Sequence, residues 1–324
     1  MKTADGEDPR VKICVLGAGS LGSAIGGRLA EAGHSVCLIN RNQSFVDAVR
    51  ARGLRLLEEG RERSVGVEAA RTPEGLAPVD LVIVLVKSFH TREAAEAARN
   101  LVGPDTMVMS LQNGLGHEDI LSEVFGRAHV LAGKTYVGGQ MTEPGLILTG
   151  VRGKETIFGE LDGALSPRML ALQAAFEAAG MTAVASPNIM GAIWDKLLIN
   201  VATGAVTAIT GLVYGDLYQT PEVEAVGLEA VKEAMTVAAA LRIRLETQAP
   251  VEAWRKAGNG LPYQFKTSML QSLEKGSITE IDFVNGAVVR AGAKAGVPTP
   301  VNATLVGLVK GVERAMILRR GGKA

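Results

Sequence analysis

A glycine-rich turn placed directly after an apolar, β-branched run is the feature that most limits how this chain can fold. Residues 11–16 read Val-Lys-Ile-Cys-Val-Leu, and they are followed by Gly17, Ala18, Gly19, Ser20, Leu21 and Gly22. A strand, such a turn and a helix present backbone N–H groups and the positive helix end to a pyrophosphate. The first glycine makes the turn, the second admits the phosphates and the third lets the helix approach the strand. The pattern predicts a dinucleotide-binding unit with these six residues at the cofactor.

The end of the second predicted strand indicates which dinucleotide is bound. The apolar run at residues 35–39 ends in Asn40-Arg41, where an NAD site usually carries an acidic residue for the ribose 2′-hydroxyl. A 2′-phosphate needs a guanidinium at this place, and Arg41 lies 19 residues after Gly22. The sequence therefore favours NADP(H). The alternative for Arg41 is an ordinary solvated arginine.

Composition limits the class of partner. The chain has 324 residues, of which 47% are hydrophobic, so it can bury a large core and form two domains. Lys+Arg and Asp+Glu balance at 34 each and aromatic residues make up 4%, which argues against a nucleic-acid surface and favours a small-molecule partner. We find no apolar run near the roughly 18 residues of a membrane span and no signal peptide in residues 1–10. We therefore expect a cytoplasmic protein without a membrane partner.

The pattern of strands and helices predicts the fold class. Residues 80–86 and 106–111 are short continuous apolar runs, as expected for parallel strands covered on both faces, with a helical segment at 91–101 between them. Residues 134–160 form short alternating pieces broken by glycine and proline, which we interpret as an antiparallel extension of the same sheet. Cys14 and Cys37 fall in neighbouring strands and are expected to be buried apolar residues, not a disulfide or a metal pair.

The second half of the chain has a different pattern of predicted helices and strands. After a helix at 168–179 and a strand at 182–185, the break at residues 186–188 starts a long helix, and helical periodicity with almost no strand signal follows. We predict an α/β fold with an N-terminal Rossmann-type doubly wound sheet and an all-α C-terminal domain. The expected parts are a loose tail at 1–10, an NADP-binding domain at 11–187 and a helical substrate domain at 188–324. Chemistry is expected in the cleft between the two domains.

Two strand ends in the first half carry polar side chains that could meet the cofactor. Lys87 follows the strand at 80–86, and Asn113 follows the strand at 106–111. Lys87 can reach phosphate or ribose oxygens, and Asn113 can bond ribose hydroxyls or the nicotinamide region. The alternatives are a solvated lysine at a strand end and a plain Asn113-Gly114 turn that tolerates positive φ.

A polar stripe on an apolar helix marks the second half. Lys196 and Asn200 are an i, i+4 pair, while Leu197, Leu198 and Val201 take another face. Hydride transfer to a ketone builds negative charge on its oxygen, so the site needs a cation that can also give up a proton. Lys196 is our candidate general acid. The alternative is a surface lysine paired with Asp195 or another carboxylate.

Ser268 and Glu280 flank a predicted bend further along the chain and could both point into a cleft. The alternative for Glu280 is a capping box, Ser277-x-x-Glu280, at the start of a helix. The histidines lack the partners of a histidine-based hydride-transfer site, and no cluster has metal-ligand spacing, so no metal is expected.

Taken together, these motifs resemble the ketopantoate reductase (2-dehydropantoate 2-reductase) family from about residue 11 to about residue 312. The resemblance rests on the glycine loop with Asn40-Arg41, residues 86–87, 111–114, 194–200, 268–271 and 279–282. It implies NADPH-dependent reduction of 2-dehydropantoate to (R)-pantoate, on the route to pantothenate. It also implies that Lys196 donates the proton, that Glu280 assists at the substrate, that Asn200, Ser268 and Asn113 contact substrate and cofactor, and that Lys87 and Arg41 contact the cofactor.

One position departs from the family pattern. The pattern usually has a second asparagine four residues after Asn200, where this chain has Gly204. A site that lacks one hydrogen-bonding group can lose much of its discrimination between substrates. Two further hypotheses therefore stand beside the first: a reductase of the same fold acting on a different 2-oxo acid, as D-2-hydroxyacid dehydrogenases do, and a non-catalytic NADP(H)-binding protein. The apolar C-terminal helices would allow a homodimer.

Overall fold

The structure is a computed structural model, and it describes residues 10–151 and 153–321. The expected tail at residues 1–10 lies outside the described residues except for Arg10. The described chain divides into two compact units, one of residues 10–112 and 117–189, the other of residues 113–116 and 190–321.

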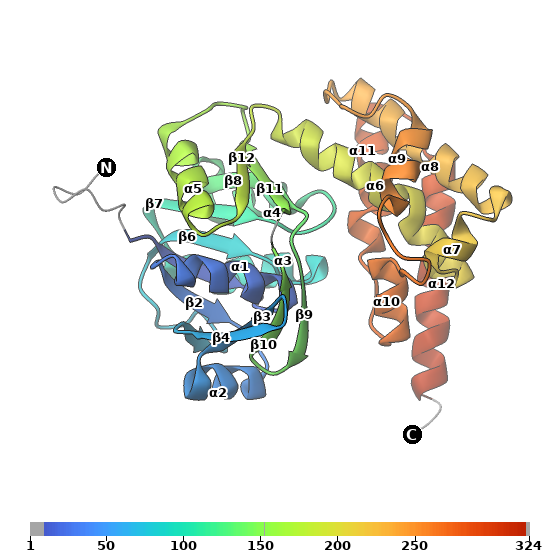
Figure 1. Cartoon of the computed structure of the whole chain (residues 1–324). Helices are drawn as coiled ribbons and strands as arrows, with labels where there is room; N and C mark the ends of the chain where they lie inside the picture. The colour runs from blue at the N-terminus through green and yellow to red at the C-terminus, as the bar shows by residue number, and fades with distance from the viewer. Residues whose placement is uncertain (1–9, 152, 322–324) are drawn as a thin grey trace. The chain divides into compact units, whose positions relative to one another are not determined.

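An eight-stranded sheet forms the centre of the first unit, with the strand order β12-β11-β8-β7-β6-β1-β2-β5 (Figure 1). Six of its strands, from β8 to β5 in that order, run parallel to their neighbours, which confirms the Rossmann-type sheet. β11 is antiparallel to β8, and β12 is parallel to β11. The bounds are β1 (Lys12–Leu16), β2 (Ser35–Ile39), β5 (Glu68–Ala70), β6 (Val79–Val84), β7 (Val102–Ser110), β8 (Val130–Thr135), β11 (Glu155–Glu160) and β12 (Thr182–Ala185).

A second sheet, which the sequence patterns did not predict, has the order β4-β3-β10-β9. It is made of β3 (Leu54–Glu58), β4 (Arg61–Val65), β9 (Gly138–Glu143) and β10 (Leu146–Gly150). The prediction that residues 134–160 extend the main sheet is therefore right for β11 and wrong for β9 and β10. Alternating polarity identifies a strand with one buried face, but it does not say which sheet receives that strand.

Helix α1 (Ser20–Glu31) packs against both sheets, and its glycines make this contact close. A Cβ built on Gly26 would lie 2.7 Å from a Leu38 methyl of the main sheet. A Cβ on Gly27 would lie 2.8 Å from a Leu54 methyl of the second sheet. Side chains at these two positions would push the sheets apart, so the glycines permit the layered arrangement.

The two faces of the main sheet are covered by different helices. One core joins α1, α2 (Gln43–Arg52) and α5 (Pro167–Ala178) to the second sheet. The other joins α3 (Thr91–Ala97) and α4 (His117–Phe125) and includes Cys14 and Cys37. These cysteines are register partners in β1 and β2, both buried and neither in a disulfide, as predicted.

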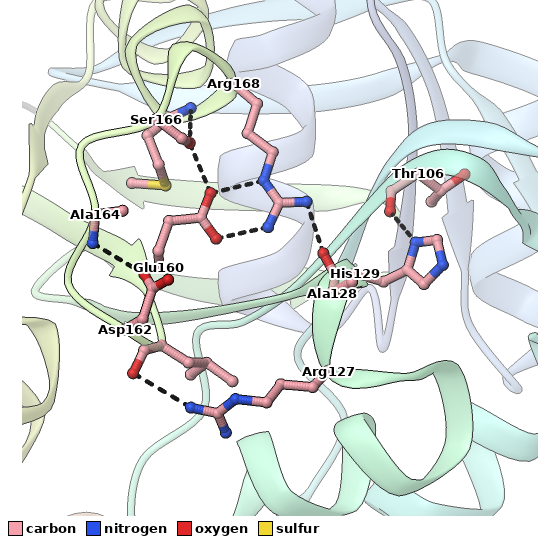
Figure 2. A network of polar contacts seen from close by, with 11 residues as sticks. Thr106, Arg127, Ala128, His129, Glu160, Asp162, Ala164, Ser166 and Arg168 are labelled. Carbon is pink, nitrogen blue, oxygen red and sulfur yellow. Dashed lines mark hydrogen bonds and ion pairs between the residues drawn. The ribbon is translucent and has the colours of Figure 1, made fainter.

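A partly buried ion pair fastens the end of β11 to the start of α5 (Figure 2). Arg168 donates from Nε and Nη2 to the two carboxylate oxygens of Glu160, at 2.6 and 2.5 Å, and from Nη1 to the carbonyl of Ala128. Ser166, the N-cap of α5, donates to the same carboxylate at 2.6 Å. These charged hydrogen bonds attach the start of α5 to the end of β11 and to the segment before β8.

The second unit consists of helices, and no strand follows β12 in the described chain. The helices are α6 (Ile189–Thr210), α7 (Tyr214–Leu217), α8 (Pro221–Ala240), α9 (Pro250–Gly258), α10 (Ser268–Glu274), a 3-10 turn η4 (Ile281–Phe283), α11 (Asn285–Ala295) and α12 (Pro300–Gly321). By length and composition α6 could cross a membrane, so the expectation that no run approaches that length is wrong. However, 72% of its most apolar stretch is buried, which is typical of the core helix of a globular unit.

Candidate active site

The glycine loop has the conformation that its sequence predicts. Gly17 has φ +91°, and a Cβ there would lie 2.4 Å from the backbone nitrogen of Val86. A Cβ on Gly22 would lie 2.6 Å from the carbonyl oxygen of Gly17. A Cβ on Gly19 would meet nothing within 4 Å, and Gly19 is exposed. The protein's own packing therefore requires Gly17 and Gly22, whereas the space above Gly19 is open to a ligand.

Some backbone N–H groups of the glycine loop bond carbonyls of the protein, whereas others belong to the first turn of α1. Those of Gly17 and Ala18 donate to the carbonyl of Ile39, and that of Gly19 donates to Gly17. Ser20 and Leu21 begin α1, where an N–H has no carbonyl one turn earlier to bond. A pyrophosphate would thus meet the first turn of α1, and the open backbone at Gly19 fits its approach. The Ser20 hydroxyl accepts from the N–H of Met141, which ties β9 to this end of α1.

Asn40 and Arg41 follow β2 at the same edge of the sheet. The side-chain amide of Asn40 donates to the carbonyl of Ala18 at 2.7 Å, so it braces the glycine loop. Arg41 is exposed, and its guanidinium lies 3.8 Å from the carboxylate of Glu93. Arg71, directly after β5, donates from Nε to the Arg41 carbonyl at 3.2 Å. The structure thus adds a second guanidinium that sequence reasoning missed, because a three-residue strand gives too short a signal to locate its end.

Lys87 lies beside the glycine loop within the first unit. It follows β6, and the close approach of Gly17 to Val86 holds this segment against the loop. Gln112 supports it from the next strand: its side-chain amide donates to the Val86 carbonyl at 2.8 Å and to the Thr91 hydroxyl at 2.9 Å. Buried His117 contacts the same hydroxyl at 3.3 Å, so it belongs to this buried network.

In the second unit, α6 carries the predicted polar stripe. Leu197 and Leu198 are buried, whereas Lys196 and Asn200 are half-buried. The carboxylate of Asp195 accepts from the backbone N–H groups of Glu246 and Thr247, each at 2.9 Å. These two bonds attach the first half of α6 to the segment before α9.

The same side of α6 continues into contacts with α10. The hydroxyls of Thr207 and Thr267 are 2.6 Å apart, and Thr267 caps α10, so Ser268 and Met269 are held beside α6. Ser268 is exposed and Met269 is buried. A Cβ on Gly204 would lie 3.3 Å from Cε and 3.4 Å from Sδ of Met269. The Met269 thioether therefore packs against Gly204, the position at which the family resemblance led us to expect an asparagine.

Glu280 directly precedes the turn η4 and is half-buried. The capping-box alternative is wrong, because no α-helix begins at Ser277, whose N–H closes the preceding helix onto Ser272. Gly276, with φ +70°, provides the left-handed residue that ends α10.

The segment that carries Asn113 packs on that same turn. Leu115 donates its N–H to the carbonyl of Phe283 at 2.9 Å. A Cβ on Gly114 would lie 2.3 Å from that oxygen, and Gly114 has φ +94°. The second unit therefore brings the segments of Asn113 and Glu280 together, which sequence spacing could not reveal. Among the described residues no group of His, Cys, Asp or Glu could hold a metal ion.

Comparisons with known proteins cover both halves of the chain. The family described as "Ketopantoate reductase PanE/ApbA" matches residues 13–163, and its C-terminal counterpart matches residues 188–313. A 2-dehydropantoate 2-reductase of Halobacterium salinarum is 35% identical over 306 residues, covering 94% of this chain and 99% of that protein. A second, from Pyrococcus horikoshii, is 32% identical over 303 residues, covering 94% and 98%.

Solved structures give the same picture. A PanE/ApbA family ketopantoate reductase from Ralstonia eutropha JMP134 superposes with a TM-score of 0.86 at 36% identity, covering 94% of this chain and 99% of that chain. A ternary structure of D-mandelate dehydrogenase with NADH and anilino(oxo)acetate superposes with a TM-score of 0.87 at 27% identity and the same coverage.

Proposed function

This chain belongs to the ketopantoate reductase PanE/ApbA family, and we propose that it reduces 2-dehydropantoate to (R)-pantoate with NADPH. The observation that carries the proposal is that relatives with this activity in their names match 94% of the chain, including the helical half that holds Lys196 and Glu280. A protein that only bound the cofactor would need neither of these side chains.

The first unit would hold the cofactor. Open space at Gly19 and the first turn of α1 fit a pyrophosphate, and Lys87 lies beside them at the end of β6. A bound reduced nicotinamide supplies the hydride that the keto carbon accepts. The 2′-phosphate of NADPH would be met by two guanidiniums, those of Arg41 and Arg71, which follow adjacent parallel strands; the Arg71 guanidinium also donates to the backbone carbonyl of Arg41. Two positive groups at one place favour a phosphate over a hydroxyl.

The second unit would supply the acid and the substrate contacts. As hydride reaches the keto carbon, the electron pair of the C=O π bond moves to the oxygen, and Lys196 gives that oxygen its proton. Glu280 would bond the substrate, and Asn200 and Ser268 would complete its contacts, with Asn113 at the cofactor or substrate. Product is an alcohol, and the lysine recovers its proton from water.

A panel of 2-oxo acids tests the substrate. We expect purified protein to oxidise NADPH fastest with 2-dehydropantoate, and slower with small aliphatic and aryl 2-oxo acids. A clear preference for another acid would refute 2-dehydropantoate as the substrate. The Met269 thioether beside Gly204 would then be the first candidate for the cause of the changed specificity. Turnover of no acid at all would refute the enzyme assignment.

Lys196→Met tests the proton donor. Removing a general acid should lower kcat by about 10²–10⁴-fold, with NADPH binding unchanged. Lys232→Met is the matched control, because Lys232 is exposed on α8 and pairs with Glu229 on the same helix. An unchanged kcat in Lys196→Met would remove this lysine from the mechanism.

Arg41→Ala and Arg71→Ala test the cofactor preference. Each should raise KM for NADPH by at least about tenfold, as expected for loss of a charged hydrogen bond to phosphate, and leave KM for NADH nearly unchanged. Arg61→Ala, at an exposed site on β4, is the control. Equal effects on both cofactors would refute the 2′-phosphate assignment.

We also propose that the protein acts in the cytoplasm as a homodimer. On α12 the large side chains of Leu308, Ile317 and Leu318 are about half exposed, and a second copy would cover them. Sedimentation of the purified protein measures this directly, and a monomer at micromolar concentration would refute it.

A further inference from the structure

The segment that carries Glu280 is attached to the C-terminal helix α12 by a buried carboxylate. Glu313 Oε1 accepts from the backbone N–H and from the hydroxyl of Thr279, both at 2.7 Å. Glu313 is 5% exposed and Thr279 is 2% exposed. Two hydrogen bonds to one buried carboxylate oxygen, shielded from water, make a stiff attachment.

The other side of Glu280 is attached to the same helix. Lys310, one turn before Glu313, donates to the carboxylate of Asp282 at 2.5 Å and lies 3.5 Å from Glu313 Oε2. Glu280 therefore lies between two residues, Thr279 and Asp282, that are both held by α12.

Hydrogen bonds within the segment fix the backbone of Glu280 itself. The Thr279 hydroxyl accepts from the N–H of Ile281 at 3.2 Å, and the Glu280 carbonyl accepts from the N–H of Phe283 at 2.9 Å. The Thr279 hydroxyl thus links the buried carboxylate of α12 to the first residue of η4. Removing this hydroxyl would loosen the backbone on both sides of Glu280.

We infer that Thr279 and Glu313 are positioning residues that hold the Glu280 carboxylate in its working place. The inference rests on the proposed function, in which Glu280 contacts the substrate. A carboxylate that binds a reacting substrate must be held to a fraction of an ångström, and displacement by about 1 Å can cost about 100-fold in rate. Glu313 lies buried behind the segment and would act only through it.

A double-mutant cycle tests the inference. Thr279→Val keeps the shape and the backbone N–H but removes the hydroxyl, and its kcat is measured with Glu280 present and in a Glu280→Gln background. We expect kcat to fall by about 10- to 100-fold with Glu280 present and by less than about twofold without it. Thr279→Ser should restore kcat to within about threefold. Thr304→Val, an exposed position on α12, is the control expected to leave kcat unchanged.

The possible results separate the roles. An equal fall in both backgrounds would mean that Thr279 serves the fold alone, and no fall with Glu280 present would mean that it positions nothing. Either result overturns the inference while leaving the proposed function intact. If Glu280→Gln alone leaves kcat unchanged, the proposed role of Glu280 fails and the inference fails with it. Thermal melting checks folding, and should Thr279→Val not fold, Glu313→Gln enters the same cycle.

Discussion

Replacing Glu118 with glutamine should change how the stability of the first unit depends on pH. Glu118 lies in the first turn of α4, next to buried His117, and is only 7% exposed. Burial raises the pKa of its carboxyl from 4.5 to about 7, and neighbouring Asp119 adds to the rise. Near neutral pH the folded protein must therefore either bind a proton here or bury a charge.

The size and sign of the effect follow from this shift. The folded-state pKa lies above the unfolded value, so folding binds a proton between about pH 4.5 and pH 7. Wild-type stability therefore falls as the pH rises through this window, by about 3 kcal/mol in total and by about 1.5 kcal/mol between pH 6 and pH 8.5. Glu118→Gln cannot ionise, so it should lose none of this stability.

The two cysteines provide the assay. Cys14 and Cys37 are the only thiols of the chain, and both are buried in the sheet of the first unit. Their rate of labelling by a thiol reagent, relative to unfolded protein at the same pH, measures opening of that unit. Both tryptophans, Trp194 and Trp254, lie in the helical unit and would not report it.

The labelling rate of the wild type is divided by that of Glu118→Gln at the same pH. We expect this ratio to be about tenfold higher at pH 8.5 than at pH 6. Asp119→Asn, which removes an exposed carboxylate from the same helical turn and keeps Glu118, should retain nearly the pH dependence of the wild type. Parallel pH dependence of the wild type and Glu118→Gln would refute the reasoning from burial.

Three other substitutions follow from the geometry. Gly19→Ala should change the melting temperature by less than about 2 °C, because the added Cβ would meet no protein atom. It should raise the Kd for NADPH at least about tenfold in a fluorescence titration, and an unchanged Kd would place the pyrophosphate elsewhere. Gly114→Ala should destabilise the helical unit by about 2 kcal/mol or more, because its Cβ would strike the Phe283 carbonyl and the residue has φ +94°. Unfolding monitored by tryptophan fluorescence measures this, and an unchanged stability would contradict that packing. Arg168→Ala should cost about 2 kcal/mol at pH 7, because hydrogen bonds from this arginine lower the pKa of Glu160. The stabilisation by the Arg168–Glu160 pair is present above the ordinary carboxyl pKa and is lost on acidification. The thiol-labelling rates of the wild type and Arg168→Ala should therefore converge under acid conditions, and a difference that stays constant with pH would contradict this prediction.

Local patterns predicted a large part of the fold because they involve neighbours in the chain. The apolar runs that became β1, β2 and β6 are continuous, as required of strands covered on both faces, and Pro187 and the residues around it interrupt the chain just before α6. The same reasoning failed for β9 and β10, whose alternation is compatible with an edge of either sheet. It also missed Arg71, since β5 has only three residues.

The sequence by itself determined the residue types and the local turns on which the proposed function depends: a glycine loop, an arginine after β2, a lysine–asparagine stripe on α6 and a glutamate beside a helix end. The residues of each feature lie within one turn or one strand, where their spacing in the sequence determines their geometry. Tertiary structure decided which distant segments support them. Arg71 joins Arg41 because β5 pairs with β2, Met269 covers Gly204 because Thr207 bonds Thr267, and Glu313 holds Thr279 across 34 residues. These pairings depend on packing and buried hydrogen bonds between elements far apart in the chain, which no local pattern encodes.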